Sequence, residues 1–476
     1  MDYMEMLDKN YDAMVDALAG SIRMKSVLAP EEKGPNGEVY HFGKDIHEAY
    51  MYVMKLGEEM GFDTANFDNY GGHIEWKAED PNAEVFAIVG HVDVVPEGEG
   101  WEDAPYDPVI KDGWMNGRGT TDDKGPVISC LYAMKVLKDA GAKPKKTIRL
   151  IIGLDEETEK RGMVYYLEKA GMPDLGITPD GEFPLINGEM GILVFQLASK
   201  LEKKHGAEGH VLRKMESGIA YNVVPNSAKA VIAPSSEDEG QAIIEKAKKY
   251  AEESGHELSA KKAGKSIAVE TKGVQAHGAR PELGLNAISV MMGFLGTIEF
   301  SSDSVNDFIS YYNEHIGFDL SGERIGCAFE DEPSGKLIFN VGLASIDEEI
   351  ASVTINIRFP VTNTGDEVYA GIEKTLEGTK IGIVKEAIEN PIFIDPEDDF
   401  VKKLMEAYVE ETGDTEGKPF VIGGGTYAKL MHRVLAFGAM FPGEEDRMHQ
   451  PNEKIDLESY KKMTRVYAKM LEKICF

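Results

Sequence analysis

The sequence predicts an α/β protein in which an inserted α+β domain splits a larger domain built on a central sheet flanked by helices. In the first part of the chain, short apolar runs of strand length alternate with amphipathic helical segments, which is typical of a largely parallel sheet covered by helices. From about residue 188 to residue 390, longer strand-like segments replace this pattern, and it then returns. We therefore expect one domain formed by residues 1–187 and 391–476, and an inserted domain formed by residues 188–390.

The elements before residue 188 follow from the spacing of apolar side chains. Helices are expected where apolar residues recur every three or four positions: about residues 4–18, 46–60 and 126–140. Strands buried on both faces are expected where a short run is mainly apolar: residues 85–90, 148–154 and 175–178. Gly61 and Gly141 follow two of the helices and predict where they end.

The inserted segment contains two groups of elements of similar size. The first group predicts strands at residues 190–199, 228–233 and 266–271, with a helix at about residues 240–253. The second group predicts strands at residues 337–343 and 352–359, followed by a helix at residues 367–376. This similarity suggests an internal duplication within the inserted domain.

The alternation of the first domain returns near residue 391. A helix is expected to begin at about Pro396, with Asp395 as its N-cap. A strand at residues 436–441 and a final helix at about residues 457–473 follow. These elements would complete the domain that the insertion interrupts.

Composition argues against several classes of partner. The formal net charge of −32 argues against nucleic-acid binding, which needs a basic surface. Because the three cysteines, Cys130, Cys327 and Cys475, are scattered, neither a disulfide framework nor a Cys-based zinc site is expected, and a reducing compartment fits. The first residues lack the features of a signal peptide, and no apolar run approaches the roughly 20 residues that span a bilayer. We therefore expect a soluble, cytoplasmic protein with no membrane partner.

Residues that can bind a metal ion follow four of the predicted strands. His91 and Asp93 follow the strand at residues 85–90, and three adjacent acids at positions 155–157 follow the next strand. Asp180 follows the third strand, and His449 lies in a loop after the fourth. Ligands of open α/β sheets bind beyond the carboxyl ends of the strands. The sequence therefore predicts one metal-binding crevice at this edge of the sheet.

Each motif also has a structural explanation when it is taken alone. The glycine-containing turn at residues 117–125 lets the backbone approach a site closely, and Asp122 in it could bridge two cations, but an Asp there could also simply cap the following helix. The three acids at positions 155–157 could be surface residues. Adjacent carboxylates at the end of a buried strand repel one another, however, unless cations neutralise them.

Taken together, the motifs resemble those of a known family. The series His91-x-Asp93, Gly119-x-x-Asp122-Asp123-Lys124-Gly125, Glu156-Glu157, Asp180 and His449 resembles the co-catalytic zinc peptidases, which include aminoacylase, succinyl-diaminopimelate desuccinylase and glutamate carboxypeptidase. Chain length and the segments 423–427, 440–442 and 448–450 are most similar to the PepV-type (Xaa-His) dipeptidases. The resemblance covers nearly the whole chain and implies a zinc-peptidase-like catalytic domain split by a lid domain.

The resemblance implies a complete binuclear site. Two Zn²⁺ ions per chain, with Mn²⁺ or Co²⁺ as substitutes, would be held by five ligands: His91, Asp122, Glu157, Asp180 and His449. Asp122 would bridge both ions and would be joined to Asp123 by a cis peptide bond. His91 and Asp180 would complete the first metal site. Glu157 and His449 would complete the second. Asp93 would orient His91, and Glu156 would be the general base.

The inserted domain carries further matches to the same family. His277, in the segment 273–287, resembles the lid histidine that reaches the active site, while Asn222 and Arg358 resemble the substrate-binding pair. Taken alone, His277 could be an ordinary loop histidine and Arg358 a surface residue. Shorter family members dimerise to supply the lid histidine. The longer insertion of this chain implies a monomer that supplies His277 itself.

The implied activity is hydrolysis of dipeptides with a free C-terminal carboxylate. Glu156 would take a proton from a water held between the metals, and His277 would donate to the developing oxyanion. Arg358 would bind the substrate carboxylate, which limits the substrate to one residue beyond the scissile bond. A deacylase or carboxypeptidase acting on N-acyl amino acids is an alternative within the family. A non-catalytic metal- or peptide-binding protein and a binuclear phosphoesterase are alternatives from other classes.

Overall fold

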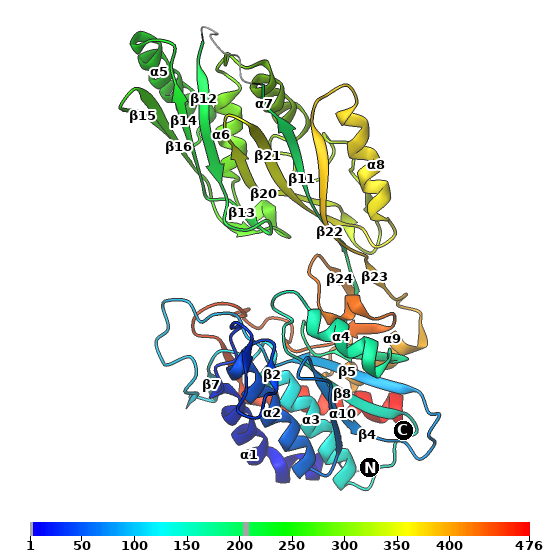
Figure 1. Cartoon of the computed structure of the whole chain (residues 1–476). Coiled ribbons are helices and arrows are strands. Elements are labelled where there is room, and N and C mark those ends of the chain that lie inside the picture. The colour runs from blue at the N-terminus through cyan, green and yellow to red at the C-terminus, as the bar shows by residue number, and fades with distance from the viewer. Residues whose placement is uncertain (1–2, 203–208) are drawn as a thin grey trace. The chain divides into compact units, whose positions relative to one another are not determined.

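The protein divides into two compact units. The structure, a computed structural model, describes residues 3–202 and 209–476 (Figure 1). The first unit comprises Met1–Gly188, Ile392–Val421 and Gly425–Phe476, and the second comprises Glu189–Pro391 and Ile422–Gly424. Both units combine helices with sheets, so the α/β prediction for the fold class is confirmed. Within the described residues, we find no helix with the length and apolar character needed to cross a membrane.

The first unit is built on a nine-stranded sheet with a parallel centre. Its strands are β3 (Asp63–Asn66), β4 (Gly72–Trp76), β5 (Val85–His91), β8 (Thr147–Gly153), β9 (Leu175–Thr178), β10 (Ile186–Glu189), β23 (Ile392–Phe393), β24 (Phe420–Ile422) and β25 (Val434–Ala436). The order is β23-β10-β25-β9-β5-β8-β4-β3, with β24 beside β10. Strands β25, β9, β5 and β8 are mutually parallel, so their carboxyl ends share one edge. Strands β5 and β8 are mainly apolar and mostly buried, as strands covered on both faces are.

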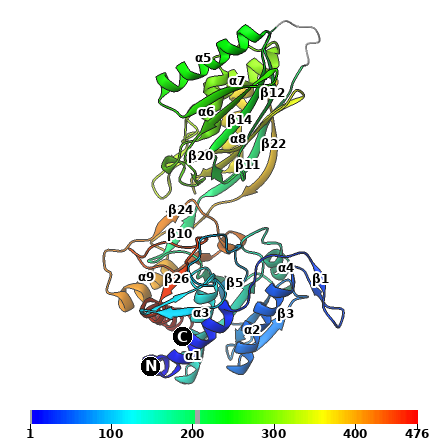
Figure 2. The ribbon, with the colours of Figure 1, turned by 90° about the vertical axis from the view of Figure 1, so that its left-hand side faces the viewer.

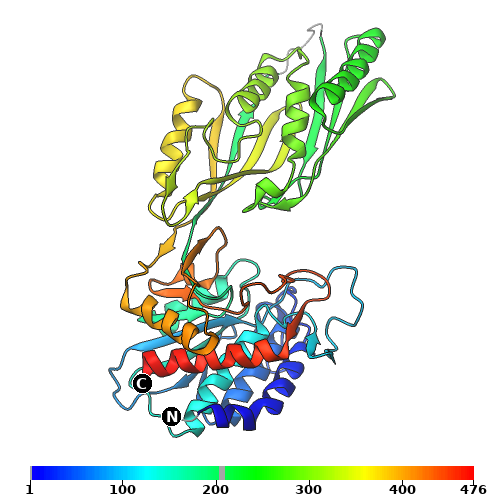
Figure 3. The same ribbon diagram turned by 180° about the vertical axis from the view of Figure 1, so that it is seen from behind.

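Helices cover this sheet. They are α1 (Tyr3–Ile22), α2 (Lys44–Glu59), α3 (Lys124–Asp139), α4 (Arg161–Ala170), α9 (Asp399–Thr412) and α10 (Leu457–Cys475). Figure 3 shows α10 beside α9 and α3, and the side chains of these helices share one apolar core with the sheet. Short strands complete the unit: β1 (Glu32–Lys33), β2 (Val39–Tyr40), β6 (Val109–Lys111), β7 (Trp114–Asn116) and β26 (Lys454–Asp456). Strand β26 pairs with β7.

Two sequence predictions in the first unit are wrong in detail. Helix α9 begins three residues later than expected, and its N-cap is Asp398, whose side chain accepts a hydrogen bond from Phe400 N at 2.8 Å. Asp395 instead accepts from Glu397 N at 2.8 Å and shapes the preceding turn. The expected strand at residues 436–441 is also displaced, because β25 ends at Ala436. The apolar run beyond it is a buried loop in which Phe437 and Phe441 pack around Phe183.

The second unit is built on an antiparallel sheet. Its order is β15-β16-β14-β12-β20-β21-β11-β22. The bounds are β11 (Gly191–Lys200), β12 (Val211–Ser217), β14 (Ser227–Ala233), β15 (Leu258–Ala263), β16 (Ser266–Lys272), β20 (Ile338–Ile346), β21 (Ile350–Phe359) and β22 (Gly382–Glu389). The helices α5 (Glu237–Ser254), α6 (Ala287–Leu295), α7 (Asp303–His315) and α8 (Gly365–Leu376) share one core with the sheet (Figure 2). The internal duplication stays a prediction.

Smaller elements lie beside this sheet. The strands β13 (Val223–Val224) and β17 (Ala276–His277) form a separate pair. The remaining short elements are β18 (Glu330–Asp331), β19 (Gly335–Lys336) and the 3₁₀ helix Pro281–Leu283 of this unit, and the 3₁₀ helix Tyr427–Leu430 of the first unit.

Candidate metal centre

The carboxyl edge of the parallel strands gathers His and carboxylate side chains. His91 is the last residue of β5, and Asp180 lies two residues beyond the end of β9. Glu157 follows β8 after a short turn, and His449 lies in the long loop after β25. Because parallel strands end at the same edge of the sheet, residues that are far apart in the sequence come together there.

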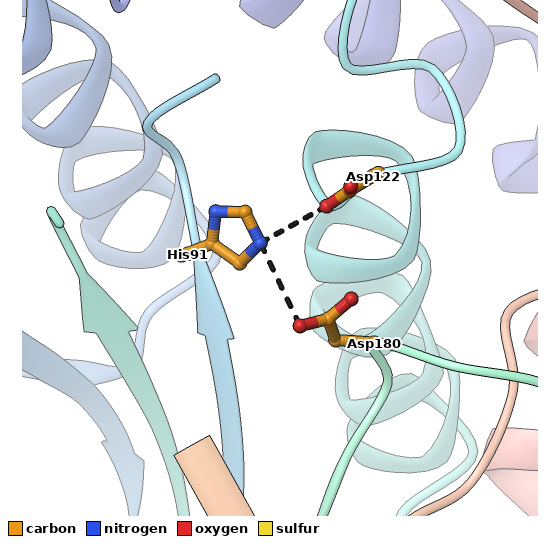
Figure 4. A group of neighbouring side chains, drawn as sticks. All are labelled: His91, Asp122 and Asp180. Carbon is orange, nitrogen blue, oxygen red and sulfur yellow. Dashed lines mark ion pairs between the residues drawn. The ribbon is translucent and has the colours of Figure 1, made fainter. Parts of the chain in front are cut away.

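The first cluster consists of His91, Asp122 and Asp180. His91 Nε2 lies 3.1 Å from Asp122 Oδ1 and 3.8 Å from Asp180 Oδ2. Both carboxylates point toward the imidazole ring (Figure 4). One ligand-type atom from each residue lies within 4.8 Å of the others, which is the spacing that a single metal ion requires. His91 and Asp122 are buried, so the cluster is largely withdrawn from solvent.

The second cluster shares Asp122 with the first. His449 Nε2 lies 2.9 Å from Asp122 Oδ2 and 3.0 Å from Glu157 Oε1, and these three residues also satisfy the 4.8 Å criterion. Asp122 thus faces the first cluster with Oδ1 and the second with Oδ2. The five residues that the family resemblance implies as metal ligands lie in these two groups.

The loop before α3 presents the shared carboxylate. The peptide bond between Asp122 and Asp123 is cis, as the resemblance implies. Asp123 makes no side-chain capping bond to α3, and its Oδ2 instead accepts a hydrogen bond from His91 N at 3.0 Å. A Cβ atom at Gly90 would lie only 2.6 Å from that oxygen, so glycine is needed where the loop approaches β5. The alternative reading of this turn as a simple helix cap is therefore wrong.

Asp93 contacts both a histidine and a neighbouring segment of the site. His91 Nδ1 lies 3.0 Å from the backbone oxygen of Asp93 and 3.3 Å from its Oδ1. The other carboxylate oxygen of Asp93 accepts a hydrogen bond from Glu157 N at 3.1 Å. The contact between His91 and Asp93 directs the Nδ1 proton of His91 to Asp93. The Nε2 atom is left facing the first cluster, as a histidine ligand requires.

The electrostatics of the two clusters favour a bound cation. Burial and the charge of Asp122 raise the pKa of Glu157 to about 7, and the same two causes hold the pKa of Asp180 well above its usual range. Burial alone would lower the pKa of His449, but its contacts with Asp122 and Glu157 outweigh burial and raise it to about 11. Without a cation, protons must relieve the repulsion among these carboxylates.

The residues fit a binuclear metal site on their own chemistry. The structure gives His91 Nε2 and Asp122 Oδ1 no hydrogen bond, although both are buried and lie 3.1 Å apart, so each can act as a ligand atom for a metal. Two imidazole nitrogens with three carboxylates form a ligand set that suits Zn²⁺ and would also accept Mn²⁺ or Co²⁺.

Glu156 lies beside the clusters but belongs to neither. Its Oε1 lies 3.0 Å from Lys160 Nζ, which also donates to the carbonyl oxygen of Gly425 at 3.1 Å. Sequence reasoning missed Lys160. Lys160 is four residues after Glu156, a spacing that suggests an ordinary ion pair on the surface of a helix. In the structure the two residues are not in a helix: Lys160 precedes α4 and has a left-handed backbone with a φ of 56°.

Asp155, the first of the three adjacent acids, has a structural role. Its two carboxylate oxygens each accept from Gly162 N at 3.1 Å, at the start of α4. Burial raises the pKa of Asp155 to about 7. Glu156 and Glu157 are thus the acids of this run that lie at the clusters.

Three predicted site residues lie in the second unit. His277, at the end of β17, pairs with Val223, and Gly278 N donates to the carbonyl oxygen of Asn222 at 2.7 Å. Asn222 and His277 are therefore neighbours. Arg358 lies on β21, is buried, and has its pKa lowered by that burial. The contribution of these residues to the site of the first unit stays a prediction.

Comparisons with known proteins agree with this site. Residues 87–473 match the model of the family described as peptidase family M20/M25/M40. A Staphylococcus saprophyticus protein named a putative dipeptidase is 33% identical over 469 residues, covering 98% of this chain and 97% of that protein. A Staphylococcus aureus protein with the same designation is 32% identical over 474 residues, covering 99% of both chains.

Solved structures share the fold at low sequence identity. Human carnosine dipeptidase 1 aligns with a TM-score of 0.52 and 16% identity over 99% of this chain and 98% of its own. Aminoacylhistidine dipeptidase from Vibrio alginolyticus aligns with a TM-score of 0.56 and 16% identity over 96% of both chains. The matched length, the metal-type clusters and the close relatives together show that this chain is a member of peptidase family M20/M25/M40.

Proposed function

We propose that the protein is a two-zinc dipeptidase that hydrolyses dipeptides with a free C-terminal carboxylate. The observation that carries the proposal is the pair of His/carboxylate clusters sharing Asp122, with the unshared carboxylate of Glu156 beside them. A purely structural metal site has no use for such a carboxylate, whereas hydrolysis needs a base that is free of metal. The names of the close relatives support the same substrate class.

Metal ions would be held by the five residues of the two clusters. Bound there, they would supply Lewis acidity that polarises the scissile carbonyl and makes water a stronger nucleophile at neutral pH. Asp122 would keep the two metal sites at a fixed separation, since its oxygens face one cluster each. Asp93 would hold the His91 ring in the orientation that presents Nε2.

Glu156 would move the proton in this reaction. Its carboxylate would accept a proton from the attacking water and deliver it to the nitrogen of the leaving amino acid. The contact with Lys160 would hold the carboxylate in one orientation, because the Lys160 ammonium is itself fixed on the carbonyl oxygen of Gly425.

The second unit would bind the rest of the substrate. Arg358 would pair with the C-terminal carboxylate, which answers how an anionic substrate binds to a protein with a net charge of −32. Asn222 would bind the peptide beside it, and His277 would donate a hydrogen bond to the oxyanion that forms at the scissile carbon. With the carboxylate and the carbonyl both fixed, one residue fits between them, so dipeptides are the expected substrates.

We further propose a cytoplasmic monomer. The three free cysteines are all buried thiols, which suits a reducing compartment. The long second unit would supply His277 from the same chain, so that no partner subunit is needed.

Metal titration combined with a hydrolysis assay tests the proposal. The purified protein, stripped with a chelator, should bind two Zn²⁺ ions per chain and regain hydrolysis of free dipeptides in parallel. Failure to bind two ions, or the absence of dipeptide hydrolysis with both ions bound, would reject the dipeptidase assignment.

A further inference from the structure

A buried glutamate outside the ligand set connects the two loops that carry the shared ligand and the second histidine. Glu453 lies four residues after His449 and immediately before β26, and its side chain is fully buried. The loop that presents Asp122 begins directly after β7, the strand that pairs with β26. The backbone oxygen of Glu453 accepts from Gly117 N at 2.9 Å, so the two loops are joined at their base.

The carboxylate of Glu453 gathers the donors of the Asp122 loop. Its Oε1 accepts from Gly119 N at 3.1 Å, Thr121 N at 2.9 Å and Asp122 N at 3.3 Å. Its Oε2 accepts from Arg118 Nη1 at 2.7 Å and again from Gly119 N at 3.1 Å. One side chain thus accepts from three backbone amides of the turn and from the Arg118 guanidinium, and the last of these amides belongs to Asp122 itself.

We propose that Glu453 is a positioning residue that fixes Asp122 and the His449 segment relative to each other and thereby sets the affinity of the metal site they share. The inference rests on the metal-site assignment proposed above. It follows from geometry: the side chain of Glu453 holds the Asp122 loop, and its backbone leads within four residues to His449. Residues that hold metal ligands in place change metal affinity by about 10–100-fold when they are replaced.

The two metal sites should not respond equally. The first cluster draws His91 and Asp180 from strand ends of the central sheet, which Glu453 does not touch. The second cluster draws both Asp122 and His449 from the segments that Glu453 joins. Loss of the Glu453 carboxylate should therefore weaken the second site more than the first.

The test compares Glu453→Gln with a control variant in which the carboxylate of another buried ion pair of the first unit is replaced in the same way. Glutamine retains one acceptor oxygen, but its NH₂ group must face either Arg118 or the backbone amides as donor against donor. The control is Glu75→Gln, because Glu75 is a buried carboxylate that accepts from Arg149 Nε at 2.7 Å on the central sheet, away from both clusters. Zn²⁺ dissociation constants are measured by competition with a fluorescent chelator, and folding is checked by circular dichroism.

We expect one of the two Zn²⁺ dissociation constants to rise about 10–100-fold in Glu453→Gln, and to rise more than the other, while both stay within about twofold in Glu75→Gln. An unchanged affinity in Glu453→Gln, or an equal loss in Glu75→Gln, overturns the inference. If Glu453→Gln does not fold, Glu453→Asp keeps the charge against Arg118, and a similar loss of affinity is expected. Unfolding of both variants also overturns the inference, because Glu453 would then serve the fold itself. Failure of the wild-type chain to bind two ions would instead reject the proposed function.

Discussion

Replacement of Glu156 by Gln separates catalysis from metal binding. The amide keeps the size of the side chain but cannot accept the proton from water. Neither cluster includes Glu156, and its one described ion pair is with Lys160 at 3.0 Å, so metal content should not change. General base catalysis is typically worth about 10²–10⁴ in rate. At 1.36 kcal/mol for each factor of ten, the barrier should rise by about 2.7–5.4 kcal/mol.

The assay measures kcat and KM for a free dipeptide by the release of amino acid, together with zinc content by mass spectrometry. The expected loss falls on kcat, with KM little changed, because Glu156 acts in the transition state rather than in substrate binding. Glu159→Gln is the matched control, since Glu159 is an exposed acid three residues further along the same loop. A Glu156→Gln enzyme that retains more than a tenth of the wild-type kcat would exclude Glu156 as the general base, and one that loses zinc would show that Glu156 helps to hold the metal.

Three further predictions concern the metal ligands and their loop. His449→Ala should lower zinc content from two ions to one per chain, because His449 belongs to one cluster alone; two retained ions would exclude it as a ligand. Zn²⁺ binding at pH 7 should release protons, because the metal-free protein holds one on His449, with a pKa of about 11, and part of one on Glu157, with a pKa of about 7. The affinity for Zn²⁺ should then fall as pH falls, by about tenfold per pH unit for each proton displaced. Calorimetry in buffers of different ionisation enthalpy measures this proton release, and a binding enthalpy that does not depend on the buffer would contradict it. Gly125→Ala should destabilise the first unit by at least about 1–3 kcal/mol, since its Cβ would lie 2.0 Å from Thr120 O; an unchanged melting temperature, as expected for Gly382→Ala, would contradict this.

The strands and helices of the first unit could largely be predicted from the sequence. Strands β5 and β8 are mainly apolar because they are largely buried on both faces, with Arg149 as the charged exception in β8, and this makes them stand out in the sequence. The apolar run at residues 437–441 also predicts a strand, and this prediction is wrong. Its side chains are buried around Phe183 in a loop, and hydrophobicity alone does not distinguish a buried loop from a strand. The N-cap of α9, Asp398, could not be predicted either, because several acids lie nearby in the sequence and each of them could cap a helix.

Some residues of the site could be predicted from the sequence, and others could be found only in the folded structure. His91, Glu157 and Asp180 could be proposed because each follows an apolar strand, and parallel strands end at one edge. Lys160 and Glu453 could not, because each lies in an acid-rich or loop-like segment without a distinctive pattern. Their roles depend on contacts with Gly425 and with the Asp122 loop, which only the folded chain brings together.

A substrate panel tests whether the protein cleaves dipeptides that carry a free carboxylate. Free dipeptides, their N-acetylated and C-amidated forms and the corresponding tripeptides are compared with Zn²⁺ or Mn²⁺ and with chelator. We predict cleavage of the free dipeptides alone, abolished by chelator and by C-terminal amidation. Preference for the N-acetylated compounds would instead assign the protein to the deacylases of its family. Cleavage of amidated or longer peptides at equal rates would exclude the proposed role of Arg358.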